Sequence, residues 1–280
     1  RPPPPHLLYT ASFGRSRSLP SPRGAACFPP RNNLLNIARH TPPPTTSAGG
    51  MPSVPAAAQT DRGAAPTAGL ASVVTAMTIA NYGVFLGILA GLAVGVVVGS
   101  VNGALVAMLK IPSFLVTLGM LGIAAGVAQW ITKSAPQPIL SDLYNKVFGS
   151  GDIGPIPGLI VWMIIVVVIG AIVLAKTRFG RQVLATGGNP IAAKFTGINT
   201  TSITFRVLLI SALLAALAGM LYAGQLQSGR YQWGTGDELS AIAAVILGGT
   251  SLFCCSGTVV GTLFGVLLIG LINNGLILAG

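Results

Sequence analysis

Long apolar runs, separated by short polar connections, limit this chain to one broad class of fold. They lie at roughly residues 70–109, 112–132, 157–175, 206–226, 237–253 and 258–279. A helix needs about 20 apolar residues to cross a hydrocarbon core of ~30 Å. The run 157–175 is marginal in length, and 237–253 is short and contains the pair Gly248-Gly249. The pattern predicts an all-α polytopic membrane protein with about five to six transmembrane helices.

The composition agrees with this class. Charged residues make up 8% of the chain and hydrophobic residues 52%, whereas an ordinary soluble domain is about 25% charged. Many glycines lie inside the apolar runs, which is more typical of membrane helices than of soluble ones. We expect the short run 237–253 to be broken or partly re-entrant. Such backbone survives at membrane depth only where protein or a water-filled cavity covers it.

Residues 1–69 have a different character. They contain both histidines, most of the prolines and, among the acids, only Asp61. The prolines prevent a continuous helix, and no apolar run is long enough for a membrane span or a signal-peptide core. We interpret this segment as a disordered, Pro/Arg-rich head. An organelle transit peptide and a non-native stretch of coding sequence are the alternatives. The membrane domain is expected to occupy residues 70–280.

Basic residues predict the orientation of the connections. The connection 176–206 contains no acid and carries Lys176, Arg178, Arg181, Lys194 and Arg206. The connections 133–156 and 227–238 carry both signs of charge. Because basic residues stay on the cytoplasmic side, 176–206 is expected to be cytoplasmic and the other two connections external.

A glycine recurs at every fourth position through the first full span: Gly83, Gly87, Gly91, Gly95, Gly99 and Gly103. Four residues advance about 400° around a helix of 3.6 residues per turn, so the stripe drifts by about 40° per step. We expect it to allow close helix packing. Small residues help any membrane helix bundle to pack, so the glycine stripe does not indicate a substrate.

The polar insert "ATGGNPIAAKFTGINTT", residues 185–201, lies between two very hydrophobic runs. Asn189 followed by Pro190 is typical of a helix start, and Gly197 is typical of a helix stop. The insert therefore predicts a helix of about two turns over residues 190–196. So short a helix is marginal alone in water, and its apolar side chains need a surface to cover them. A groove on a soluble partner fits this need; the alternative is its own membrane helices or the lipid headgroups.

The sequence does not indicate a catalytic, cofactor-binding or metal site. It contains no G-x-x-x-x-G-K-[ST] phosphate loop. Residues 70–280 contain no histidine, which excludes Ser-His and Cys-His nucleophile pairs there. The acids of that region lie in external connections or at the ends of runs, where solvated loop charge is the simpler interpretation.

Several stretches together resemble one transporter family. "TRFGRQVLATGGNPIAAKFTGIN" resembles the cytoplasmic coupling loop of bacterial sugar ABC transporter permeases of the ribose/xylose type. "DELSAIAAVILGGTSLF" and "GTVVGTLFGVLLIGLINNGL" resemble the segments that follow it, and "SVNGALVAMLKIPSFLVTLGMLGIAAGVAQ" and "IGPIPGLIVW" resemble the family's middle region. The resemblance covers residues 70–280. It implies an inner-membrane permease subunit that is truncated at both ends relative to the family.

The resemblance also implies partners and roles. Two permease copies would line a path through the bilayer, a separate cytoplasmic ATPase pair would bind ATP, and a periplasmic sugar-binding protein would deliver the sugar. It implies no nucleic-acid partner. The residues implied to contact the ATPase are Gly187, Gly188, Asn189, Pro190, Ala192, Ala193, Phe195, Gly197 and Ile198.

Three amides inside apolar runs, Asn102, Asn273 and Asn274, are candidates for a sugar path, because an amide both donates to and accepts from hydroxyls. Hydrogen bonding between helices is an equally good interpretation of them. Ser211 and Gln129 are weaker candidates.

Two features depart from the family. Cys254 and Cys255 stand where the family has small, glycine-rich sequence. We interpret them as a substitution or a sequence error rather than a redox centre, because a metal site lacks further ligands and a disulfide between neighbours is strained. Spans that the family has before residue 70 and after the Asn273–Asn274 helix are missing. A non-functional permease fragment and a branched-chain amino acid permease therefore stand as alternatives to a sugar permease.

Overall fold

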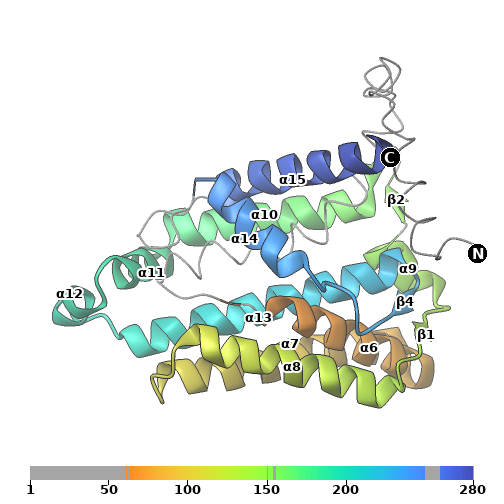
Figure 1. Ribbon diagram of the computed structural model, residues 1–280, viewed down its shortest axis with the longest axis horizontal. Coiled ribbons are helices and arrows are strands. Elements are labelled where there is room, and N and C mark those ends of the chain that lie inside the picture. The colour runs from red at the N-terminus through yellow and green to blue at the C-terminus, as the bar shows by residue number, and fades with distance from the viewer. Residues whose placement is uncertain (1–60, 62, 150, 154–155, 250–258, 280) are drawn as a thin grey trace, which may run out of the picture.

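The computed structural model describes residues 61, 63–149, 151–153, 156–249 and 259–279. This part of the chain is mostly helical (Figure 1). The long helices are α6 (Ala64–Tyr82), α7 (Val84–Ala107), α8 (Ser113–Thr132), α10 (Gly158–Lys176), α13 (Thr200–Gln225) and α15 (Val259–Ala279). The short helices are α9 (Asp142–Phe148), α11 (Arg178–Gly188), α12 (Pro190–Phe195) and α14 (Asp237–Leu247). Four two-residue strands are β1 (Gln137–Pro138), β2 (Asp152–Ile153), β3 (Ile156–Pro157) and β4 (Ser228–Gly229).

Among the described residues, four helices are long and apolar enough to cross a membrane: α7, α8, α10 and α13. A shorter apolar stretch, Gly261–Ile272, lies within α15. α14 has 11 residues, which is too short to cross a ~30 Å core and agrees with the broken segment expected there. Helix α13 is the central span, because most of its apolar segment is buried inside the bundle, whereas only a minor part of the apolar segments of α7, α8 and α10 is buried.

The predicted apolar run 70–109 divides into two antiparallel helices, α6 and α7. The division falls at Gly83, whose φ of 92° and ψ of 171° suit glycine far better than a residue with a Cβ. Helix α6 begins at Ala64, six residues before the boundary expected at residue 70. Its first residues are buried because it packs against α7, α8 and α13.

The glycines of α7 lie against α6 and α13. A Cβ on Gly99 would come within 2.9 Å of both the Leu209 Cα and the Ala212 Cβ, and a Cβ on Gly95 within 2.9 Å of the Ala216 Cβ. Gly87, Gly91 and Gly103 are equally crowded. Gly83 was expected to share this role, but it forms the turn between the helices and a Cβ there would meet nothing within 4 Å.

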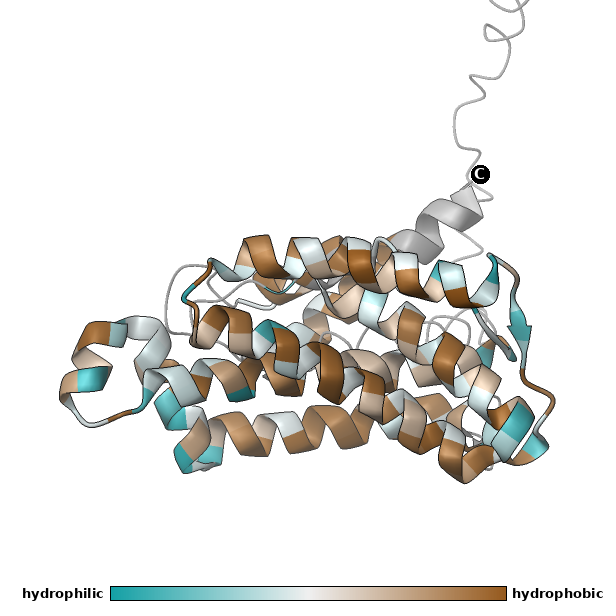
Figure 2. Ribbon diagram, turned by 90° about the horizontal axis from the view of Figure 1, so that it is seen from below, coloured by the Kyte–Doolittle hydropathy of each residue, from teal (hydrophilic) through white to brown (hydrophobic). Residues whose placement is uncertain are grey.

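The connections lie at two ends of the bundle. Helices α11 and α12 are at one end, and α9, β1 and β4 are at the other (Figure 1). Strand β1 pairs antiparallel with β4, so the two connections predicted to be external meet. Hydrophobic residues dominate the helices between the ends, and hydrophilic residues gather near both ends (Figure 2). This arrangement agrees with the orientation predicted from the basic residues.

Candidate functional site

The connection predicted to be cytoplasmic forms a pair of short helices, α11 and α12, each capped by a side chain of the connection itself. The Thr177 hydroxyl accepts a hydrogen bond from the Gly180 N–H at 3.1 Å and so caps α11. A Cβ on Gly180 would collide with the Leu174 carbonyl, so glycine permits the sharp turn from α10 into α11. Val183 of α11 is fully buried in a cluster with Val207 of α13. These contacts fix α11 to the membrane helices.

Helix α12 has the cap and the stop that the sequence predicts. The Asn189 Oδ1 accepts from the backbone N–H groups of Ile191 and Ala192, both at 3.0 Å. After the last turn, Gly197 has a φ of 83°, and its N–H donates to the Lys194 carbonyl at 3.0 Å. Helix α12 therefore keeps a defined shape despite having only 6 residues.

Helix α12 leads directly into the central span. Residues 196–199 join Phe195 to α13, whose first turn is capped by the Asn199 Oδ1 accepting from the Ser202 N–H at 3.1 Å. Ala193 is 4% exposed, so the inner face of α12 is held by the rest of the protein. Only the four residues 196–199 separate α12 from the start of α13.

The outer face of α12 is apolar and uncovered. Phe195 is 89% exposed and Ile191 is 67% exposed. The basic residues Lys194, Arg181 and Arg178 are exposed nearby. Together these residues form a candidate docking surface.

The nine predicted coupling residues divide by burial. Those at the surface are Gly188, Asn189, Pro190, Ala192, Phe195 and Gly197. Ile198 is half-buried, and Gly187 and Ala193 are buried. Gly187 and Ala193 therefore hold the loop together and are not available to a partner in this conformation. Adjacent residues of so short a helix point in different directions, which sequence spacing alone did not resolve.

A second polar group lies inside the bundle, around the start of α6. The Ser211 hydroxyl of α13 donates to the Asp61 Oδ2 at 2.6 Å, and the Gly63 N–H donates to the Asp61 Oδ1 at 2.8 Å. Asn102 of α7 is 3% exposed, and its Oδ1 has no hydrogen-bond partner among the described residues. A Cβ on Gly63 would lie 3.3 Å from the Asn102 Nδ2, so the amide faces this group.

Sequence reasoning found Asn102 but placed Asp61 in the head and gave Ser211 little weight. The available signal was an acid just before an apolar helix, the usual position of a helix cap. The other candidates lie elsewhere. The Gln129 Nε2 donates to the Ser134 Oγ at 3.2 Å at the opposite end from α12. Asn273 and Asn274 fall in α15 but outside the described side chains, and Cys254 and Cys255 lie outside the described residues.

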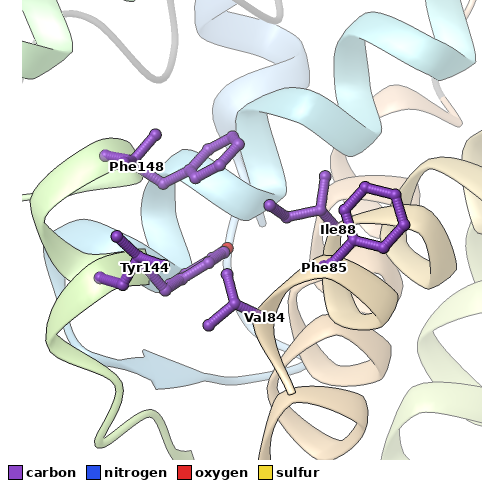
Figure 3. Close-up of a pocket in the computed structure, with 7 residues that line it drawn as sticks. Val84, Phe85, Ile88, Tyr144 and Phe148 are labelled. Atoms are coloured by element: carbon purple, nitrogen blue, oxygen red, sulfur yellow. The ribbon is translucent and has the colours of Figure 1, made fainter. Parts of the chain in front are cut away.

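A pocket of about 240 Å³ lies between α7 and α9. Tyr144 and Phe148 of α9 face Val84, Phe85 and Ile88 of α7 across it (Figure 3). The Tyr144 hydroxyl donates to the Met220 carbonyl at 2.8 Å, and burial raises the pKa of Tyr144. The lining is apolar and aromatic, so the pocket offers a sugar few hydrogen-bonding groups.

No group of three or more His, Cys, Asp or Glu side chains that could hold a metal ion occurs among the described residues. The described part thus combines helices long and apolar enough to span a membrane, a capped short helix with an exposed apolar face at one end, and a buried polar group between the spans. These features define a multi-pass membrane protein.

Comparison with known proteins gives the family. A family model described as branched-chain amino acid transport system / permease component matches residues 54–280. The chain therefore belongs to this family of transporter permeases. It is a permease component rather than an enzyme, and it is a multi-pass protein of the inner membrane.

Individual relatives cover different shares of the chain. The inner membrane ABC transporter permease protein YjfF of Escherichia coli is 44% identical over 178 residues, which are 61% of this chain and 53% of YjfF. The ribose import permease RbsC of Bacillus subtilis is 39% identical over 250 residues, 89% of this chain and 78% of RbsC. Escherichia coli RbsC is 37% identical over 256 residues, with 89% and 79% covered. The chain thus spans about half the length of YjfF. No solved structure matches the chain.

Proposed function

We propose that this chain is the membrane-spanning subunit of an ATP-driven sugar importer and that α12 is its contact with a separate cytoplasmic ATPase subunit. The observation that carries the proposal is the exposed apolar face of α12. A phenylalanine that is 89% exposed, on a capped helix between two membrane spans, needs a partner to cover it.

The connection between α12 and α13 supports a coupling role. Helix α12 is joined to α13 by residues 196–199, and α13 packs against both α6 and α7. When the ATPase subunits close on ATP, the displacement of α12 moves the central span. The path then changes between outward-facing and inward-facing states. The chain lacks a phosphate-binding loop, so ATP is bound by the partner.

The remaining parts of the proposed assembly are a second permease copy and a periplasmic binding protein that delivers the sugar. Asn102, Asn273 and Asn274 are our candidates for the sugar route. Asn102 is buried beside the start of α6 in this conformation, so a route along it requires movement of that helix start.

A branched-chain amino acid substrate is the second candidate, because the description of the matching family names that class. Relatives named as ribose import permeases match 89% of this chain, which favours a sugar. Competition for uptake distinguishes the two: we expect pentoses, but not leucine, to compete. Competition by leucine alone would reverse the assignment. A chain that neither assembles nor transports would be the non-functional fragment.

The contact with the ATPase is tested by Phe195→Asp. A charge at the centre of an apolar contact must be desolvated, so we expect co-purification of the ATPase subunit to fall by roughly tenfold or more. Leu140→Asp is the matched control, because Leu140 is also 89% exposed but lies in the connection at the other end of the bundle. Equal recovery of the ATPase with Phe195→Asp and Leu140→Asp would contradict the proposed contact.

A further inference from the structure

Asp61 is a buried acid between the membrane-spanning helices. Its side chain is 4% exposed, and its carboxyl oxygens accept from the Ser211 hydroxyl and the Gly63 N–H. Acids among membrane spans are costly and mark function more often than packing. Asp61 is not among the residues assigned above to the docking surface.

The position of Ser211 in α13 shows how far along the bundle its hydrogen bond to Asp61 lies. Ser211 is eleven residues after Thr200 and fourteen before Gln225, so it lies near the middle of the 26-residue α13. At about 1.5 Å per residue, it is roughly 16 Å from the start of α13. Asn102, five residues from the end of α7, reaches the same place from a neighbouring span.

Asp61 therefore anchors the start of α6 inside the bundle. Helix α6 begins within the length of the bundle and runs to the end where β1 and β4 lie (Figure 1). The middle of α6 contacts the connection predicted to be external, since the Ser72 hydroxyl donates to the Arg230 carbonyl at 3.1 Å. Helix α6 thus joins the middle of α13 to the outer face of the protein.

The hydrogen bond from Ser211 holds Asp61, three residues before the start of α6, to the span that α12 moves; the Asp61 carboxylate in turn accepts from the Gly63 N–H, next to the first residue of α6. Beside it the two helices pack closely, since a Cβ on Gly219 of α13 would collide with the Ala68 carbonyl of α6. Packing contacts are individually weak, whereas a buried hydrogen bond to a carboxylate fixes two groups at one distance and direction. The buried bond is the link that would pull α6 when α13 shifts.

We propose that Asp61 is a positioning residue for transport: through Ser211 it makes α6 follow α13 when the coupling helix moves, so that the outer end of the path responds to ATP. This inference rests on the proposed function. It assigns to Asp61 and Ser211 a role in coupling that is distinct from ATPase assembly, which depends on α12.

The test uses the assembled transporter and compares the sugar taken up per ATP hydrolysed. Ser211→Ala removes the donor to Asp61, and loss of a hydrogen bond to a carboxylate changes an equilibrium by roughly tenfold. We expect uptake per ATP to fall by about that factor, while the ATPase co-purifies and hydrolyses ATP as in the wild type.

Two further variants separate positioning from other roles. Asp61→Asn keeps the side-chain shape and a hydrogen bond to Ser211, so it should retain coupling. Thr78→Val replaces a hydroxyl of α6 that donates to the Val74 carbonyl of the same helix, and it should also retain coupling.

Each outcome decides the inference. Unchanged uptake per ATP in Ser211→Ala overturns it, even if the variant is less stable to heat. Loss of coupling in Asp61→Asn equal to that in Ser211→Ala also overturns it, because the charge and not the hydrogen bond would then matter. Failure of the wild-type chain to bind any ATPase subunit would refute the proposed function instead. If Ser211→Ala does not fold, Asp61→Ala provides the same comparison from the other partner of the bond.

Discussion

At the scale of single residues, glycine has different environments in two of the spans, α7 and α8. The glycines of α7 lie against the backbone and side chains of α6 and α13. Gly119, Gly122 and Gly126 of α8 have nothing within 4 Å of where a Cβ would lie. Counting glycines in the sequence therefore overstates how many are needed for contact between the helices described here.

Gly99→Ala tests this difference. The new Cβ would come within 2.9 Å of the Leu209 Cα, which is backbone and cannot rotate away. Overpacking of this kind costs about 1–3 kcal/mol, so we expect a lower thermal midpoint of the detergent-solubilised protein. Gly122→Ala is the matched control in α8 and should keep or raise the midpoint, because alanine is the better helix former. A lower midpoint for Gly122→Ala than for Gly99→Ala would contradict the packing seen here.

At the scale of elements, residues close together in the sequence were enough to predict α12, whereas α11 and the burial of Asp61 depend on contacts with distant parts of the chain. The cap at Asn189 and the stop at Gly197 act within a few residues of sequence, and the structure shows both. Helix α11 was not predicted because it contains Gly180 and ends at Gly187 and Gly188; burial of Val183 stabilises it. The burial of Asp61 depends on Ser211, 150 residues further along the chain, and no local pattern shows such a contact.

Asn189→Ala tests whether the cap maintains α12. Removing a capping side chain typically costs about 1 kcal/mol, and the backbone N–H groups of Ile191 and Ala192 lose their acceptor. We expect faster hydrogen exchange at these two amides and weaker recovery of the ATPase subunit. Asn189→Asp keeps the acceptor oxygen and should behave like the wild type. Equal exchange in Asn189→Ala and wild type would show that packing of Ala193 alone holds the helix.

At the scale of the whole molecule, the sequence predicted which connections lie on the same side but not that they touch. The basic residues of 176–206 separated it from 133–156 and 227–238. The pairing of Gln137 with Gly229 then joins the two external connections. Such a pairing between strands of two residues depends on the helices that bring them together. The number of spans also depends on the whole bundle. The apolar pattern of the sequence placed α6 and α7 in one long run, whereas the structure shows α6 as a separate helix buried among its neighbours.

The orientation of the whole molecule gives the last prediction. Leu140 and Phe195 are both 89% exposed. Leu140 lies between β1 and α9 and Phe195 is the last residue of α12, and these elements are at opposite ends of the bundle (Figure 1), so single cysteines at the two positions should react from opposite sides of the membrane. In a background in which Cys27, Cys254 and Cys255 are replaced by alanine, a membrane-impermeant maleimide added to intact cells should label Leu140→Cys. The same reagent should label Phe195→Cys only after the membrane is opened, because basic residues hold that connection inside.

Binding of the ATPase subunit should also protect Phe195→Cys in opened membranes and leave Leu140→Cys reactive. Labelling of both positions from outside would place α12 on the wrong side to meet an ATPase, and the coupling proposal would fail with the topology.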